Sequence, residues 1–285
     1  MSGETLARQP GPSADEPPDL FLDLVRDLQR ARRARDAHGL FFIEGVRNFV
    51  RAADHSWPFE RLLVSQVLLK CGVARKLAQR LKREGIPVLE LSPESFRSVS
   101  QTPHASGVAA VLRQRVHRLH ELNPRQGRCW LVVQQIRSPG NLGTLLRTSA
   151  AAGGAGLILV GGKVDAFEPG LIRASMGAFF EQPIACTGVP QLRDWIRRHR
   201  LQVVGATPDA PVTHFETHFR TPTLLVLGEE RKGLQDELVP LCDQLVRIPM
   251  QDGIDSLNVA VAGSLLMYEV LRSSRRLTTG KRQRR

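Results

Sequence analysis

A polar segment at residues 138–148 holds two side chains suited to ligand binding. Asn141 offers an amide that can hydrogen-bond a ligand or cap a helix, and Arg147 places a permanent positive charge six residues further on. Pro139 and Gly140 predict a turn before the helix, so both side chains would lie within its first two turns. Taken alone, a helix cap and a surface arginine are the simpler explanations of this pair.

Two later segments combine glycines with polar residues in a similar way. At 227–234, Gly228 would let the backbone approach a ligand closely, although a solvated loop explains the segment equally well. At 248–260, a glycine turn precedes a helix that Asp255 or Ser256 can cap. Asn258 would then lie in the first turn of an otherwise apolar helix, where a buried amide needs hydrogen-bond partners.

Several familiar signatures are incomplete, and this narrows the function classes. The glycines at 153–156 precede a predicted strand, whereas the dinucleotide-binding turn follows one. The Gly-Gly-Lys at 161–163 lacks the first glycine and the final hydroxyl residue of a phosphate-binding loop. His214 and His218 lie four residues apart but without the order of a zinc protease. We therefore expect no metal site and no nicotinamide cofactor.

The second half of the chain predicts a parallel sheet that would position these segments. Short, nearly continuous apolar runs alternate with helix-like stretches, which is typical of strands covered by helices on both faces. Ligands bind such sheets at the carboxyl ends of the strands, and the three polar segments each follow a predicted strand. The predicted strands are 130–134, 157–160, 183–187, 202–206, 223–227 and 245–248. An apolar helix from about Ser256 to Arg272 completes this part.

The first half predicts a smaller α/β unit. Leu20, Leu24 and Leu28 have helical spacing and predict one amphipathic helix with a basic end. Predicted strands at 40–43, 61–65, 87–91 and 107–112 follow, with a helix at 71–84 between the second and third. The expected organisation is a disordered tail at 1–19, a domain at 20–113, a basic linker at 114–128, a domain at 129–273 and a basic tail at 274–285.

Charge and cysteine content indicate the class of partner. The formal net charge of +12 suits a phosphate backbone, although a solvated basic surface would give the same value. The expected RNA contacts are the arginines of the first basic run, Arg30, Arg32, Arg33 and Arg35. Four separated cysteines predict free, mostly buried thiols and a cytoplasmic location. No apolar stretch is long enough to span a membrane, so no membrane partner is expected.

Taken together, the three polar segments resemble motifs one, two and three of the SpoU (TrmH-like) branch of the SPOUT RNA methyltransferases. The segment at 173–178 is similar to the family's Ser-x-Gly-Ala stretch. Glu44-Gly45 and residues 101–111 are similar, more loosely, to the family's L30e-like RNA-recruiting domain. This chain departs from the family at Ser138, where an aspartate is usual, and at Arg231, where the family usually has glycine.

The resemblance implies a deep trefoil knot in the C-terminal α/β domain and a homodimer in which each site is completed by the second subunit. It also implies that S-adenosyl-L-methionine is the cofactor. The cofactor would be held largely by backbone, at Leu227, Gly228, Ile248, Met250, Leu257 and Asn258. The implied catalytic residues are Arg147, Asn141, Glu230, Ser256 and Asn258. Because a guanidinium stays protonated, we expect Arg147 to clamp phosphate and stabilise the developing alkoxide, not to act as a base.

The implied activity is methyl transfer from S-adenosylmethionine to a ribose 2′-hydroxyl of a structured RNA. The N-terminal L30e-like domain favours large-subunit rRNA over tRNA, and an antibiotic-resistance methylase has the same layout. A catalytically inactive RNA-binding or ribosome-assembly factor is the alternative, which the retained Asn141, Arg147, Ser256 and Asn258 disfavour. A nucleotide-dependent oxidoreductase is disfavoured by the missing glycine fingerprint.

Overall fold

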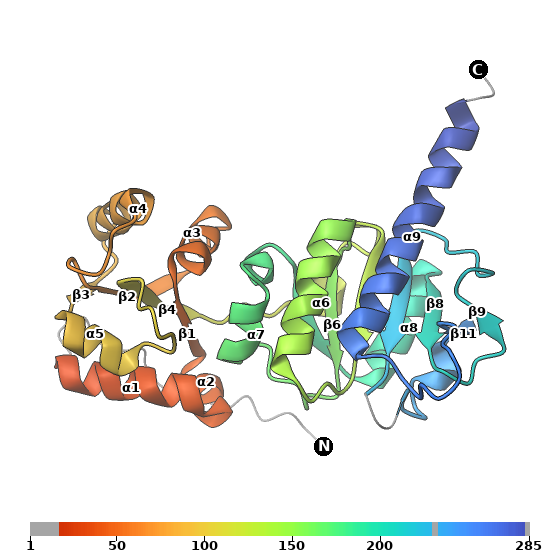
Figure 1. The fold of residues 1–285 in the computed structure, drawn as a ribbon, viewed down its shortest axis with the longest axis horizontal. Coiled ribbons are helices and arrows are strands. Elements are labelled where there is room, and N and C mark those ends of the chain that lie inside the picture. The colour runs from red at the N-terminus through yellow and green to blue at the C-terminus, as the bar shows by residue number, and fades with distance from the viewer. Residues whose placement is uncertain (1–16, 230–232, 283–285) are drawn as a thin grey trace. The chain divides into compact units, whose positions relative to one another are not determined.

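The computed structural model describes residues 17–229 and 233–282, with side chains as far as residue 274. The described chain forms two compact units (Figure 1). The first contains the residues up to Arg115 together with Phe167–Phe180, and the second contains Val116–Ala166 and the residues from Glu181 onward. Most of the predicted disordered tail, residues 1–16, lies outside the described residues, whereas Pro18 and Asp19 already belong to the first helix.

The first unit is built on a mixed four-stranded sheet with the order β1-β4-β2-β3. Strand β4 runs antiparallel to both β1 and β2, and β3 runs parallel to β2. All four strands were predicted, with ends shifted by one or two residues. Their bounds are β1 Leu40–Glu44, β2 Phe59–Val64, β3 Val88–Glu90 and β4 Val108–Arg113.

Helices cover the two faces of this sheet (Figure 1). On one face, α1 and α5 bury an apolar core that includes Phe21, Leu28 and Phe96 against the strands. The predicted amphipathic helix with a basic end is α1, which ends at Arg30, but the rest of the basic run forms a separate helix, α2, because the extended backbone of Ala31 lies between them. The bounds are α1 Pro18–Arg30, α2 Arg32–His38, α3 Val46–Asp54, α4 Gly72–Arg83 and α5 Pro93–Val99.

A segment from the second half of the sequence packs within the first unit. It comprises Phe167, helix α7 (Pro169–Ala174) and a 3₁₀ turn, η2 (Ala178–Phe180). The ring of Phe41 lies 4.9 Å from that of Phe167 and 5.8 Å from that of Phe179, measured between centroids. The indole nitrogen of Trp57 donates a 2.9 Å hydrogen bond to the carbonyl of Phe180. These contacts make 167–180 part of the N-terminal core.

The second unit is built on a seven-stranded sheet with the order β7-β6-β5-β10-β8-β11-β9, in which every pairing is parallel. This confirms the predicted parallel sheet, and β8 and β10 have the predicted bounds. Strand β9, a two-residue edge strand, was not predicted. The bounds are β5 Cys129–Val133, β6 Gly156–Val160, β7 Ile184–Thr187, β8 Gln202–Ala206, β9 Val212–Thr213, β10 Thr223–Leu227 and β11 Gln244–Arg247.

Two layers of helices cover this sheet (Figure 1). On one face, α6 (Pro139–Ala152) and α9 (Val259–Arg282) pack against each other and against β6 and β10. On the other face, α8 (Val189–His199) and the 3₁₀ turns η1 (Leu119–Glu121) and η3 (Val239–Leu241) pack on a continuous apolar core. Helix α9 begins three residues later than predicted and continues through most of the segment expected to be a basic tail.

The cysteines are free, as predicted, but they differ in exposure. Cys129 is buried in β5, and desolvation raises the pKa of its thiol to about 12. Burial also raises the pKa of the Cys242 thiol, to about 11. Cys186, at the end of the edge strand β7, is exposed, which corrects the expectation of mostly buried thiols for this residue.

Candidate functional site

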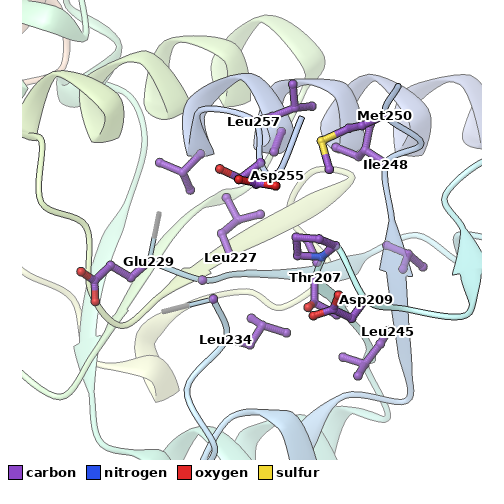
Figure 2. Close-up of a pocket in the computed structure, with 18 of the residues that line it drawn as sticks. Thr207, Asp209, Leu227, Glu229, Leu234, Leu245, Ile248, Met250, Asp255 and Leu257 are labelled. Carbon is purple, nitrogen blue, oxygen red and sulfur yellow. The ribbon is translucent and has the colours of Figure 1, made fainter. Parts of the chain in front are cut away.

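A pocket of about 560 Å³ opens at the carboxyl ends of β8, β10 and β11. Figure 2 shows Thr207 and Asp209, which follow β8, on one side and Glu229, which follows β10, on the other. Its lining is Ala206, Thr207, Pro208, Asp209, Leu227, Gly228, Glu229, Gly233, Leu234, Val239, Leu245, Val246, Ile248, Met250, Asp255, Ser256, Leu257, Val259 and Ala262. A parallel sheet places ligand sites at this edge.

The second and third polar segments meet in this pocket. Leu227, Gly228, Ile248, Met250 and Leu257, five of the six residues predicted to hold a cofactor, line it. Ser256 lines it too, from the loop that leads into α9. These six residues therefore converge from segments about twenty residues apart in sequence, because the carboxyl ends of parallel strands share one edge of the sheet, whereas Asn141, Arg147 and Asn258 do not line the pocket.

The sixth predicted residue, Asn258, links the third segment to the first. Its amide nitrogen Nδ2 donates a 3.1 Å hydrogen bond to Oδ1 of Asn141, at the start of α6. Its oxygen Oδ1 accepts hydrogen bonds from the backbone nitrogens of Ala260, at 2.9 Å, and Val261, at 3.3 Å. This double acceptance is the pattern of a helix N-cap. Asn258 therefore connects the N-terminus of α9 to the N-terminus of α6.

Two expectations for this region are corrected by that geometry. Asp255 and Ser256 were the predicted caps of the last helix, but Asn258 takes that position because α9 begins at Val259. Asn258 was also expected to be a buried amide, and it is exposed. The helix cap and the hydrogen bond to Asn141 account for the hydrogen-bond partners of its side chain.

The loop after β10 is closed by backbone packing around Gly228. The nitrogen of Glu229 donates to the carbonyl of Gly233, and the nitrogen of Gly233 donates to the carbonyl of Glu229, both at 2.9 Å. A Cβ atom at Gly228 would lie 2.5 Å from the nitrogen of Leu234 and closer still to the carbonyl group of Gly233. Only glycine fits there. Glu230, the predicted acidic residue of this loop, lies outside the described residues, as does Arg231.

Glu229 is an acidic residue of the pocket that the sequence analysis did not single out. Its side chain is buried and pairs with the guanidinium of Arg137, which is half exposed. Its second oxygen, Oε2, is buried and has no hydrogen-bond partner among the residues that the structure describes. The sequence signal that could have identified Glu229 was its place, a charged residue two positions after the end of an apolar strand.

The other two carboxylates of the lining, Asp209 and Asp255, are exposed and form no ion pair within the described parts of the chain. No arginine or lysine belongs to the described lining. The pocket therefore combines an apolar floor, backbone groups at strand ends and two unneutralised carboxylates. Such a lining suits a ligand with an apolar or aromatic body and positive charge.

Arg147, the predicted catalytic arginine, lies on α6 and does not line the pocket. The side chain is exposed on α6, six residues after Asn141, and makes no hydrogen bond or ion pair with any described residue. Helix α6 is held against α9 by the hydrogen bond from Ser264 Oγ to Thr148 Oγ1, at 3.0 Å. Arg147 is thus fixed in position by its helix, and its guanidinium is available to a ligand outside the pocket.

The four arginines predicted to contact RNA do not share one environment. Arg30, Arg32 and Arg33 are exposed, and Arg32 pairs with Asp36 at 3.2 Å. Arg35 is only 3% exposed, and its guanidinium donates a 2.5 Å hydrogen bond to the carbonyl of Leu28. This burial removes Arg35 from the surface that an RNA could reach, because its charge holds α2 against α1 instead.

The described residues also lack the features of two other classes of protein. They hold no group of three or more histidine, cysteine, aspartate or glutamate side chains arranged to bind a metal ion. None of the helices within 17–229 and 233–282 has the length and hydropathy required to cross a bilayer.

Comparison with known proteins gives consistent matches over both units. Residues 128–268 match the SpoU rRNA Methylase family, and residues 24–110 match the MRM3-like substrate binding domain. The chain is 31% identical over 258 residues to the 23S rRNA (uridine(2479)-2'-O)-methyltransferase of Streptomyces viridochromogenes, covering 87% of this chain and 89% of the relative. It is 29% identical over 186 residues to the 23S rRNA (guanosine(2553)-2'-O)-methyltransferase RlmP of Bacillus subtilis, covering 65% of this chain and 73% of the relative.

Solved structures with the same fold include two that contain a bound ligand. The AdoMet-bound rRNA methyltransferase from Sinorhizobium meliloti has a TM-score of 0.81 and 30% identity, covering 88% of this chain and 94% of that one. The SpoU methyltransferase AviRb from Streptomyces viridochromogenes, in complex with the cofactor AdoMet, has a TM-score of 0.82 and 27% identity, covering 89% of this chain and 97% of that one.

Proposed function

The chain belongs to the SpoU rRNA methylase family, and we propose from this that it transfers a methyl group from S-adenosylmethionine to a ribose 2′-hydroxyl of 23S rRNA. The observation that carries the proposal is the pocket at the ends of β8, β10 and β11, lined by five of the residues predicted for the cofactor. Relatives that methylate 23S rRNA and solved structures with bound AdoMet support the same activity.

The residues present fit the cofactor. The volume of about 560 Å³ lies within the range of about 300–1,000 Å³ usual for such sites. The glycine-closed loop at Gly228 offers backbone groups at close range, and Asp209 and Asp255 complement the positive charge of a sulfonium and an amino group. Leu227, Ile248 and Leu257 would hold the apolar body.

When bound, S-adenosylmethionine supplies an electrophilic methyl group, so the protein's task is chiefly placement. The Asn141–Asn258 hydrogen bond fixes the start of α6 relative to the start of α9, and thereby orients Arg147 relative to the pocket. The Arg147 guanidinium would bind a phosphate next to the target ribose and stabilise the negative charge that develops on the 2′-oxygen. Ser256, at the pocket wall, would help to orient the ribose. Glu230 keeps a proposed orienting role.

The homodimer is also a proposal, and an exposed face of α9 supports it. Val261, Leu265 and Tyr268 follow one another at helical spacing and are 49%, 44% and 51% exposed. They line an apolar groove together with Thr144 of α6, which precedes Arg147 by one turn. A second copy packed on this face would bring its own residues close to Arg147, as the family resemblance implies. The deep trefoil knot stays a prediction.

For the RNA we propose contacts with Arg30, Arg32 and Arg33, whose guanidinium groups are exposed, and not with the buried Arg35. Such contacts would make binding fall steeply with salt concentration. An rRNA substrate would also require the protein to act where ribosomes are assembled, in agreement with the predicted cytoplasmic location.

Two measurements test the proposal. Calorimetric titration with S-adenosylmethionine should show saturable binding, and transfer of labelled methyl to 23S rRNA should produce a linkage that resists alkaline hydrolysis. RNA binding without cofactor binding would instead identify an inactive RNA-binding or assembly factor. Mapping ribose methylation in rRNA from cells with and without the protein would then identify the nucleotide.

A further inference from the structure

A second cavity, of about 550 Å³, lies at the carboxyl end of the edge strand β7. Two strands, β6 and β5, separate β7 from β10 in the sheet, and the second cavity shares no lining residue with the first. It lies between η1 and α8 and is lined by Arg118, Leu119, His120, Cys186, Thr187, Gly188, Gln191, Asp194, Trp195 and Arg198. The proposed methyl transfer uses none of these residues.

The charged side chains of this second cavity favour an anion. Arg118 comes from the basic linker and Arg198 from the last turn of α8, and both are exposed at its wall. His120 lies beside them in the lining, and Asp194 is the one carboxylate among the described lining residues. Two guanidinium groups against one carboxylate leave a positive excess, and guanidinium groups match the geometry of phosphate oxygens.

The start of helix α8 adds to this preference. Gly188 precedes the helix at the cavity wall, and no side chain caps the first turn. The helix has 11 residues, and its amino end carries a partial positive charge; Pro190 has no N–H, so Val189 and Gln191 supply the backbone N–H groups that lack a partner within the helix. A helix start of this kind is a common binding place for phosphate groups.

An unpaired indole N–H provides an independent indication of a ligand. Trp195 is 5% exposed, and its Nε1 is buried without a hydrogen-bond partner in the part of the chain that the structure describes. The indole nitrogens of the other two tryptophans are paired: Trp130 donates to Pro124 at 3.1 Å and Trp57 donates to Phe180 at 2.9 Å. Buried donors in proteins are nearly always satisfied, so an unpaired one in a residue that lines a cavity needs an explanation, and an acceptor bound in the cavity would provide one.

We propose that this second cavity binds a backbone phosphate of the RNA substrate. The proposal rests on the proposed function for the identity of that RNA. A polyanion fits better than a small metabolite because most of the polar lining residues, including Arg118 and Arg198, are exposed at the surface. The cavity would hold the RNA to the catalytic unit at a second point, away from the reacting ribose.

The first test follows the indole resonances of the ¹⁵N-labelled protein, with Trp195 assigned through Trp195→Phe. Titration with a 23S rRNA fragment, without cofactor, should shift the Trp195 indole signal. An unmoved Trp195 signal at saturating RNA would overturn the proposal. A shift caused by inorganic phosphate but not by RNA would also overturn the proposal, because the cavity would then bind a small anion and not an RNA phosphate.

The second test compares two double variants. Arg118→Ala with Arg198→Ala should weaken RNA binding about tenfold and lower the salt dependence by about 1.4 to 1.8, the loss of two phosphate contacts at about 0.7 to 0.9 each. The control, Arg193→Ala with Arg197→Ala, removes two exposed arginines of α8 that do not line the cavity. If both double variants lose the same RNA affinity, the proposal of a specific phosphate site is refuted, because the overall positive charge of the surface would then explain the binding.

Kinetics separate this inference from the proposed function. In the Arg118/Arg198 variant the KM for RNA should rise while kcat and the Kd for S-adenosylmethionine stay at the wild-type values, because neither residue lines the cofactor pocket. If the wild type binds RNA with the Trp195 shift but binds no S-adenosylmethionine, the enzymatic proposal fails and the phosphate site stands. If methyl transfer occurs but RNA does not shift the Trp195 signal, the phosphate site fails and the enzymatic proposal stands.

Discussion

Substitution of Gly228 by alanine tests whether tight backbone packing shapes the pocket that we propose for the cofactor. A Cβ atom at this position would lie 2.5 Å from the nitrogen of Leu234, whereas ordinary van der Waals contact begins at 3.4 Å. The loop must therefore open by at least about 0.9 Å, the difference between these distances, and by more at the carbonyl group of Gly233, which would lie closer still. Opening by that amount would carry the two 2.9 Å hydrogen bonds between Glu229 and Gly233 beyond their normal length.

The magnitude follows from these two effects. Loss of two backbone hydrogen bonds costs about 0.5–1.5 kcal/mol each, and overpacking adds about 1–3 kcal/mol. The total is about 2–6 kcal/mol, shared between the free energy of unfolding and the free energy of re-forming the pocket around a ligand. Because about 1.4 kcal/mol is a tenfold change in affinity, even half of the lower end, about 1 kcal/mol, corresponds to a loss of cofactor affinity of about fivefold.

The assay combines urea unfolding with calorimetric titration of S-adenosylmethionine, and Gly233→Ala is the matched control. Gly233 belongs to the same loop and has φ +67°, but no atom lies within 4 Å of a Cβ built on it. It should therefore show only left-handed backbone strain, about 1–2 kcal/mol. The reasoning is refuted if Gly228→Ala is as stable as this control and binds the cofactor within about threefold of wild type.

Three further predictions concern the joined helix starts, the exposed arginine and the thiols. Asn258→Ala should lower the free energy of unfolding by about 2 kcal/mol, because it removes the helix cap and the hydrogen bond to Asn141. Asn258→Asp should keep most of the cap and lose less. Equal losses of the two variants in urea unfolding would contradict this. Arg147→Ala should reduce methyl transfer by about a hundredfold or more with nearly unchanged cofactor affinity, and a parallel loss of both would assign it a structural role. At pH 8, peptide mapping after alkylation should find Cys186 modified well before Cys129, because burial raises the Cys129 pKa to about 12 and keeps its thiol protonated. Fast modification of native Cys129 would show that β5 opens.

The strands and the pocket could be predicted because their physical causes are local. A strand buried on both faces must be apolar along its whole length, so 202–206 and 223–227 were located with the bounds that the structure has. The edge of the sheet at which the pocket lies then follows from where those strands end, whereas the individual residues expected to hold the cofactor came from the family resemblance. Gly228 is a clear case, since a glycine directly after a buried strand indicates close backbone approach.

The cap of α9, the burial of Arg35 and the role of Glu229 depend on residues that are distant in sequence, so the local sequence pattern could not predict them. Asp255, Ser256 and Asn258 can all cap a helix, and only the packing of α9 on α6 selects the third. A basic run gives no sign of which arginine is buried, so Arg35 could not be distinguished from its exposed neighbours. The role of Glu229 depends on Arg137, which lies 92 residues earlier.

The segment 167–180 limits how the protein can be divided. A fragment beginning at residue 116 would carry the rings of Phe167 and Phe179 without Phe41 and Trp57, the aromatic residues that they contact. A fragment ending at residue 115 would leave Phe41 and Trp57 uncovered. Neither piece can therefore be transplanted into a chimaera as one continuous stretch, and recombination between homologues would have to exchange 167–180 along with the amino-terminal part to keep the aromatic cluster matched.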